Sequence, residues 1–469
     1  MNESTNTDRR RWSALALIVT AQFMVILDVA IVNVALPSIK PDLGFSQSGL
    51  QWVVSAYAIV FGGTLLLGGR LADLLGRRRL FIFGLLLFAV SSLLCGLAWS
   101  AGSLVAFRGV QGLAGAILAP AALSLLMTSF AEGKERNRAL GIYGAASGSG
   151  AAVGVLLGGI LTSYLGWTWI FFVNVPVGLA AAALAPVLLR ESRADLGHRH
   201  FDVKGAVAVT GGLMLFVYAL SQAPAHGWAS WSTVALLAVS AAAIGAFVRI
   251  EVHSPWPLLP MRIFRSRTLS TANATMGLIG AVMFSEFFVL TLYLQDVLHY
   301  SAVKTGAAFV GFAGAVVVVS NLTQPIVARI GVRRALLAGV VLSGLSVAYL
   351  TRLPVDAHYF TDLFPAFVVG GTGVGLSIVP VTIASLQGVA RADAGVASGL
   401  VNTSRQIGGA VGIAATSAII AGHSYQDALY TMTGVLVAGA LLVAVLLRTP
   451  RVRVDAEPAL ETVVLREAA

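Results

Sequence analysis

Charged residues are scarce in this sequence. Asp, Glu, Lys and Arg make up 11% of its 469 residues, and 57% are hydrophobic, whereas an ordinary soluble domain has about 25% charged residues. There is one cysteine, so no intrachain disulfide can form, and the seven histidines show no metal-ligand spacing. These shortages exclude most soluble enzymes and disulfide-stabilised secreted domains, and they predict no metal site and no enzymatic cofactor.

The charges that are present are mostly basic, and the formal net charge is +10. In a soluble protein this excess would suggest a nucleic-acid partner. Here most Lys and Arg residues fall in short segments between apolar stretches, as at 9–11, 77–79 and 333–334, where membrane topology requires them. We therefore expect a lipid bilayer around the protein and no nucleic acid.

Apolar segments long enough to cross a bilayer recur along the whole chain. A helix needs about 20 residues to span a hydrocarbon core about 30 Å thick. The sequence predicts fourteen spans, at 14–36, 50–69, 80–100, 103–128, 138–162, 167–188, 203–222, 232–250, 269–292, 304–327, 332–351, 361–385, 396–421 and 428–447.

An even number of spans puts both termini on one side, and the concentration of Lys and Arg on that side makes it cytoplasmic. The first apolar segment is long and ends in Leu36 and Pro37 instead of a small-residue cleavage site, so it reads as a retained span. We expect an all-α multi-pass protein of the plasma membrane, with no cleaved leader.

The two halves of the chain resemble each other. Gly141, Gly150 and Gly154 align with Gly399, Gly408 and Gly412 at a constant offset. A parallel repeat of this kind is typical of transporters. It predicts a cytoplasmic N-terminus (1–13), a six-helix bundle (14–190), two inserted spans with their linkers (191–268), a second six-helix bundle (269–447) and a cytoplasmic tail (448–469).

The loop between the second and third spans reads GGRLADLLGRRRL at 68–80. Its glycines permit a tight turn and close packing, and its arginines can pair with carboxylates or lipid phosphates. A basic loop that only sets topology is the alternative. The ordered spacing favours a functional loop, whose candidate residues are Gly69, Asp73, Gly76, Arg77, Arg78 and Arg79.

This loop resembles the G-x-L-A-D-x-x-G-R-R-x-x-L signature of the major facilitator superfamily. LVAFRGVQGLAGA at 104–116 resembles the fourth-helix motif with its embedded Arg108, and LDVAIVNVALPSI at 27–39 and WTWIFFVNVPVG at 167–178 resemble segments of the fourteen-span drug:proton antiporters. The resemblance implies a major facilitator fold with two extra central helices, alternating access, multidrug efflux and antibiotic resistance. It also implies that the loop at 69–79 gates the cytoplasmic side, with the proton as the only coupling ion.

One motif departs from the family pattern. The fifth-helix antiporter motif is G-x-x-x-G-P-x-x-G-G, whereas this chain has GAAVGVLLGG at 150–159, with Val155 in place of proline. The motif glycines Gly150, Gly154, Gly158 and Gly159 are retained, so close helix packing is expected, but the proline bend is not. An exporter or proton-coupled importer of one metabolite therefore remains an alternative, as does a membrane sensor that transports nothing.

Asp28 is a carboxylate inside the first span, and such a charge marks a functional site by default. Counted at 1.5 Å per residue, Asp28 and Arg108 lie at similar depths. We expect an ion pair, because pairing lowers the cost of burying both charges, and protonation of Asp28 would release Arg108. A static structural pair is the alternative reading.

Glu286 is the other carboxylate well inside a span, and it is a candidate second proton site or an anchor for a cationic substrate; a position facing lipid is the alternative. Asn402, Arg405 and Gln406 share one helix face. The substrate expected is a lipophilic, possibly cationic small molecule bound by a monomer. The candidate cavity residues are Phe23, Asn33, Tyr57, Gln111, Phe284, Phe288, Asn402, Arg405 and Gln406, although the aromatic ones are common in bundle packing.

Overall fold

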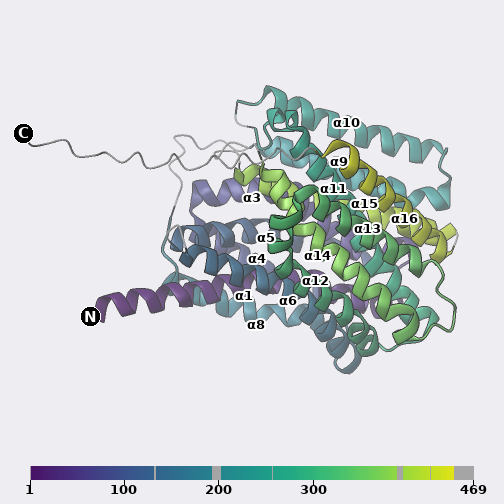
Figure 1. The fold of residues 1–469 in the computed structure, drawn as a ribbon, viewed down its shortest axis with the longest axis horizontal. Coiled ribbons are helices and arrows are strands. Elements are labelled where there is room, and N and C mark those ends of the chain that lie inside the picture. Colours follow the sequence, from purple (N-terminus) through teal and green to yellow (C-terminus); the bar gives the residue numbers. More distant parts are fainter. Residues whose placement is uncertain are drawn as a thin grey trace, which may run out of the picture.

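The computed structural model describes residues 2–130, 134–192, 202–255, 257–387, 394–422 and 424–447. Across these residues the regular structure is helical (Figure 1). Thirteen of the helices are long and apolar enough to cross a membrane. The helix at Ala394–Gly422 is also long but is not among the thirteen, and its polar residues include Asn402, Arg405 and Gln406.

The first half of the chain forms eight helices, of which six are long. Their bounds are α1 (Asn2–Asp42), α2 (Gln47–Leu50), α3 (Trp52–Leu75), α4 (Arg77–Gly96), α5 (Ala101–Ser129), α6 (Lys134–Tyr164), α7 (Trp169–Phe172) and α8 (Asn174–Leu188). Residues 2–13, predicted as a segment before the first span, continue α1 without a break. Nothing in that stretch interrupts a helix, since it contains neither proline nor glycine.

The rest of the chain supplies two inserted helices and a second set of six long ones. The inserted helices are α9 (Val203–His226) and α10 (Trp231–His253), which lie together along one edge of the molecule (Figure 1). The second set is η1 (Met261–Arg265), α11 (Arg267–Leu292), η2 (Tyr293–Val297), α12 (Ala302–Ile330), α13 (Val332–Leu350), η3 (Tyr359–Leu363), α14 (Phe364–Leu386), α15 (Ala394–Gly422) and α16 (Tyr425–Leu446). The predicted tail at 448–469 lies outside the described residues.

The aligned glycines occupy the same kind of contact in the two halves. In the first half, α6 packs on α1, and a Cβ atom on Gly154 would lie 2.8 Å from Ala30 Cβ. In the second half, α15 packs on α11, and a Cβ atom on Gly412 would overlap the backbone of Ala281. Glycine at these positions lets two helix backbones approach closely.

The loops that follow the second helix of each half also correspond. Gly76 joins α3 to α4 with φ 114°, and Gly331 joins α12 to α13 with φ 84°. Both angles are ones that residues with a Cβ rarely adopt. The loose match between GRRRL at 76–80 and GVRRAL at 331–336 thus coincides with the same backbone turn in both halves.

We call the end of the bundle where α1 begins the near end, and the end where α1 finishes at Asp42 the far end. The two halves touch at the far end through α6 and α12: Gly306 packs on the Val155 backbone, and Gly159 packs on Ala302. Val155 is 1% exposed in this contact, and α6 continues through it as a helix. With valine in place of the motif proline, α6 is an uninterrupted helix where it packs against the second half.

Candidate functional site

Asp28 and Arg108 form an ion pair in the interior of the first half, as the depth argument predicts. Arg108 Nη1 donates to Asp28 Oδ2 at 2.6 Å, and the two side chains are 1% and 0% exposed. The pair joins the middle of α1 to the first third of α5. Because both charges are removed from water, each depends on the other for compensation.

Two amide side chains complete the coordination of the Asp28 carboxylate. Gln111 Nε2 and Asn174 Nδ2 each donate to Asp28 Oδ1 at 2.8 Å. Gln111 also donates to Ser92 Oγ at 2.7 Å and accepts from Arg108 Nη1 at 2.6 Å. Three helices, α1, α5 and α8, therefore meet at one carboxylate, and α4 joins them through the bond from Gln111 to Ser92.

Arg108 is held on its other sides by α3 and α7. Its Nε donates to the Val53 carbonyl at 2.9 Å, and its guanidinium carbon lies 4.5 Å from the Tyr57 ring centre and 5.7 Å from that of Phe171. An arginine over the face of an aromatic ring gains electrostatic stabilisation that is largest when water is excluded. Arg108 is thus positioned by contacts that do not involve Asp28.

Both oxygens of the Asp28 carboxylate are supplied with donors. In the ionised form the carboxylate accepts three hydrogen bonds from described side chains, two of them from neutral amides. A proton on Asp28 would cancel the ion pair and leave Arg108 with a buried charge, whose cost favours rearrangement. Coupling a proton to helix movement requires this kind of linked response.

Glu286, on α11, is buried without such coordination. It is 5% exposed, and its Oε1 has no hydrogen-bond partner among the described residues. The hydroxyl of the neighbouring Ser285 is likewise buried and unpartnered. The structure places Glu286 inside the second half and so excludes a fully lipid-exposed side chain, but it gives the carboxylate no cationic partner.

The polar face predicted on α15 lies in the contact between the halves. Arg405 Nη2 donates to Asn402 Oδ1 at 2.8 Å, and its guanidinium carbon lies 6.0 Å from the Phe284 ring centre. Gln406 is 3% exposed and packs beside Gly62 of α3, with its Oε1 unpartnered among the described residues. No described carboxylate pairs with Arg405.

The remaining cavity candidates fall into different surroundings. Tyr57 and Gln111 belong to the Asp28 network described above. Asn33 donates to the Val29 carbonyl of its own helix at 2.9 Å, and Phe288 is completely buried in the second half. Phe23 is half-buried on α1 where α6 packs.

Asn174 and Ser92 are members of the network that sequence reasoning did not select. Asn174 lies within the WTWIFFVNVPVG segment, where it is the one amide in an otherwise apolar stretch. Polar side chains in apolar spans tend to pair with one another. That pattern marks Asn174 as a site residue, whereas Ser92 carries no comparable signal, because serine is common in membrane helices.

The basic loop binds a carboxylate of its own half. Arg78 and Arg79 lie 3.9 and 3.7 Å from Glu191 Oε2, and the Arg78 amide donates to Glu191 Oε1 at 3.1 Å. A Cβ atom on Gly76 would lie 2.8 Å from that carboxylate, so glycine is required there. Gly69 faces Pro120. Arg77 donates its amide to the Ser192 carbonyl, and the Asp73 side chain lies outside the described residues.

The motif glycines on α6 pack against two different helices. Gly150, Gly154 and Gly158 face α1, where Cβ atoms would lie 3.2 Å or less from the backbone or side chains of Phe23, Ala30 and Ile31. Gly159 faces α12 in the other half. The motif thus packs α6 against its own half on one side and against the second half on the other.

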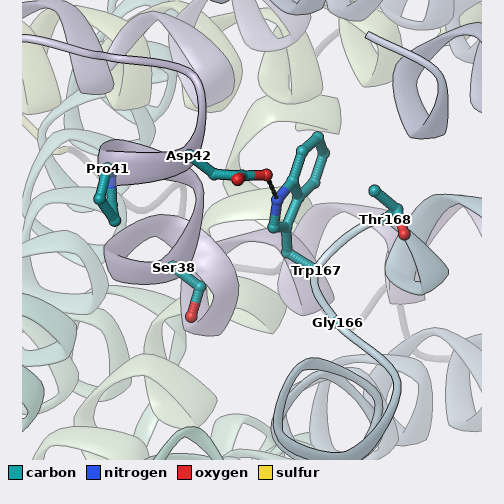
Figure 2. Close-up of a pocket in the computed structure, with 6 residues that line it drawn as sticks. All are labelled: Ser38, Pro41, Asp42, Gly166, Trp167 and Thr168. Carbon is teal, nitrogen blue, oxygen red and sulfur yellow. Dashed lines mark hydrogen bonds between the residues drawn. The ribbon is translucent and has the colours of Figure 1, made fainter. Parts of the chain in front are cut away.

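A pocket of about 520 Å³ opens at the far end of the first half (Figure 2). It lies between the end of α1 and the loop from α6 to α7, and it is lined by Ser38, Pro41, Asp42, Gly166, Trp167 and Thr168. Trp167 Nε1 donates to Asp42 Oδ2 at 2.6 Å. This bond ties the end of α1 to the start of the sixth-helix motif.

Further bonds join the two halves near this pocket. Gln295 Nε2 donates to the Val34 carbonyl at 2.9 Å, and the Val303 amide donates to Ser163 Oγ at 3.3 Å. Together with the contact of α6 and α12, these bonds close the far end. The buried ion pair, the paired halves and the spanning helices define a membrane transporter.

The chain belongs to the Major Facilitator Superfamily, whose family model matches residues 18–413. It is 42% identical over 459 residues to the puromycin resistance protein pur8 of Streptomyces alboniger, covering 94% of this chain and 90% of that protein. It is 40% identical over 448 residues to the cephamycin export protein CmcT of Amycolatopsis lactamdurans, covering 92% of each.

Solved transporter structures share the fold at low sequence identity. A peptide transporter POT in complex with sulfate matches with a TM-score of 0.69 and 16% identity, over 92% of this chain and 94% of that one. The predicted fold class and family are confirmed by these comparisons. The protein is a multi-pass transporter of the major facilitator class.

Proposed function

We propose that the protein exports lipophilic small molecules, including antibiotics, from the cytoplasm in exchange for protons. The observation that carries this proposal is the buried network of Asp28, Arg108, Gln111 and Asn174, because a titratable carboxylate with a single cationic partner links proton binding to helix packing. Relatives that share about 90% of their length with this chain are named for antibiotic resistance and export, which supports export as the direction.

In this proposal the two sets of six long helices move against each other as bundles, with the near end cytoplasmic, as the distribution of Lys and Arg predicts. The far-end bonds of Gln295 and Val303 to the first half close the outer side. A proton that reaches Asp28 from outside weakens its hold on Arg108 and favours reorganisation of the bundle. Release of that proton to the cytoplasm restores the ion pair and accompanies substrate binding.

Substrate binding is assigned to the second half, where the buried polar groups have unused hydrogen-bonding capacity. Glu286 and Gln406 each have an unpartnered oxygen, and Arg405 has a charge without a described carboxylate. Groups in this state gain from a ligand that offers partners. Phe284, beside Arg405, supplies an aromatic surface for a lipophilic ring.

The test is transport in proteoliposomes under an imposed pH gradient, acidic inside, with a fluorescent lipophilic cation. The native protein is expected to accumulate the cation against its concentration, and Asp28→Asn is expected to reduce gradient-driven uptake to that of empty vesicles. Asp42→Asn is the matched control, since Asp42 lies at the end of the same helix and outside the network. Equal uptake by native protein and Asp28→Asn would exclude Asp28 as the coupling group.

An exporter dedicated to one natural product is the second candidate. The name of the relative CmcT, a cephamycin export protein, favours it. The same vesicles distinguish the two: a panel of chemically unrelated substrates moves in the multidrug case, and one compound class moves in the dedicated case.

A further inference from the structure

Two buried carboxylates lie close together at the near end, away from the Asp28 network. Asp202 is the N-cap of α9 and is 9% exposed, and Glu251 lies in the last turn of α10 and is 2% exposed. Each side chain uses one oxygen: Asp202 Oδ1 accepts from the Gly205 amide at 2.7 Å, and Glu251 Oε2 accepts from the Leu259 amide at 3.1 Å.

The other two oxygens point at the same place. Asp202 Oδ2 and Glu251 Oε1 are both buried and without a hydrogen-bond partner among the described residues. Each lies 3.0 Å from the position that a Cβ atom on Gly205 would take. The two orphan oxygens therefore face a common small space that is open because residue 205 is glycine.

No described cation compensates this pair. The described basic side chains of α9, α10, η1 and the start of α11 that lie closest in sequence are all exposed to solvent: Lys204, Arg249, His253, Arg262, Arg265 and Arg267. No ion pair joins any described residue to either carboxylate. Two ionised carboxylates buried side by side repel each other and lose hydration. Glu251 also lies at the C-terminal end of its helix, where the backbone carbonyls disfavour a negative charge.

We propose that Asp202 and Glu251 bind one proton between Asp202 Oδ2 and Glu251 Oε1, and that this proton keeps the linker at Leu259 packed between the two halves. The proton comes from the near-end solvent and forms an O–H···O hydrogen bond that uses both orphan oxygens. Ca²⁺ and Mg²⁺ take six or more oxygen ligands, and Zn²⁺ takes three or four protein ligands. No group of three or more His, Cys, Asp or Glu residues lies together in the described part of the chain.

The linker contact gives this proton a structural effect. Leu259 is buried in a cluster with Ala397 and Leu400 of α15, and Leu66 of α3 packs against the same cluster. The cluster thus joins the second half to the first at the near end. Because Glu251 accepts from the Leu259 amide, loss of the proton and repulsion from Asp202 displace the group that holds Leu259 in place.

The test is hydrogen–deuterium exchange of the full-length protein in lipid nanodiscs, followed for the backbone amides of Ser254, Leu258 and Leu259 from about pH 6 to about pH 9. Each native rate is divided by the rate in Glu251→Gln at the same pH, which removes the chemical pH dependence of exchange. Glutamine keeps the shape and always donates to Asp202. The native protein is expected to match this variant at low pH and to exchange about tenfold faster at high pH.

Two further variants separate the proton from other causes. Gly205→Ala places a methyl group between the oxygens and is expected to release the linker even at low pH. Glu135→Gln changes an exposed carboxylate at the same end and is expected to keep the native pH response. The proposal is overturned if the linker amides of the native protein exchange at the same rate as those of Glu251→Gln at every pH. It is also overturned if the protection of these amides from exchange depends on sodium or potassium concentration at fixed pH.

Discussion

The two halves of this transporter share a packing plan but differ in how they bury charge. In the first half, the Asp28 carboxylate accepts three hydrogen bonds and its arginine is held from several sides. In the second half, Glu286 has an unpartnered oxygen and Arg405 bonds to an amide instead of a carboxylate. Buried polar atoms without a described partner occur in both halves, the Tyr57 hydroxyl among them. The halves differ in their charged groups: the carboxylate of the first half has an arginine and two amides as donors, whereas Glu286 and Arg405 have no oppositely charged partner among the described residues.

This difference indicates a division of labour. A buried carboxylate that is bonded to several helices and to one arginine holds those helices together, which suits proton coupling. Unsatisfied groups carry a desolvation cost that a ligand can relieve, which suits recognition. Variants that alter one half and leave the other intact test whether the two halves have these different roles.

The largest effect is expected from removing one charge of the Asp28 pair. Asp28→Asn leaves Arg108 buried without its counter-ion, which should destabilise the protein by about 3–5 kcal/mol. The double variant Asp28→Asn with Arg108→Met removes both charges and should recover most of that stability. Thermal unfolding in detergent, followed by the loss of monodisperse protein, measures both.

A transport assay of the same variants distinguishes a loss of stability from a loss of proton coupling. Neither the single nor the double variant should carry out gradient-driven uptake, even where the double variant is stable. Gradient-driven uptake by the double variant would mean that the pair serves only the structure of the first half.

A smaller effect is expected from the glycines that pack each half, and here the two halves should behave alike. Gly154→Ala places a methyl group 2.8 Å from Ala30 Cβ, and Gly412→Ala places one against the Ala281 backbone. Overpacking of this kind costs about 1–3 kcal/mol. Gly144→Ala on α6 and Gly422→Ala on α15 are matched controls, because nothing lies within 4 Å of either site.

The functional consequence should still differ between the halves. Gly154 touches Leu27, the neighbour of Asp28, so Gly154→Ala should reduce proton-driven uptake more than its stability loss explains. Gly412→Ala should reduce uptake only in proportion to the amount of folded protein. Equal reductions at equal stability would remove the distinction between the halves.

Much of the fold, and the central pair of the candidate site, is predictable from the sequence. Spans follow from apolar length, and the pairing of Asp28 with Arg108 follows from helix rise, because burial leaves each charge few alternatives. The repeat follows from glycines that only close helix packing requires. The helix break at Gly76 is equally local, because its positive φ is one that residues with a Cβ rarely adopt.

Other contacts depend on tertiary arrangement and have no local signal. Nothing at 69–79 indicates that Arg78 and Arg79 bind Glu191, more than a hundred residues away. Nor does the sequence near Asp202 indicate that its partner is Glu251, at the other end of a helical hairpin. The orientation of Glu286 also depends on how the second half packs, since one carboxylate in a span can face either protein or lipid.

A more modest effect is expected from the unsatisfied groups of the second half. Glu286→Gln removes a negative charge and should raise the apparent KM for a lipophilic cation about tenfold, which corresponds to about 1.4 kcal/mol. Arg405→Gln removes a positive charge from α15 of the same half and should leave that KM unchanged or lower it. Initial rates of uptake over a range of cation concentrations give both values.

A neutral substrate provides the control for charge. Its KM should change less than about threefold in Glu286→Gln, because no ionic attraction is lost. If both variants change the KM of cationic and neutral substrates by the same factor, the second half contributes shape and not charge to recognition.

The smallest effect is expected at the far end of the first half. Trp167→Phe keeps the aromatic ring but removes the bond to Asp42 at the pocket of Figure 2, and one hydrogen bond of this kind contributes about 1 kcal/mol. The unfolding temperature should fall by a few degrees while uptake stays within about twofold of native, because the bond lies within one half and does not join the two. Asp42→Asn should do less, since its amide oxygen still accepts from Trp167. A loss of uptake as large as that of Asp28→Asn would instead make this far-end bond part of the coupling between the halves.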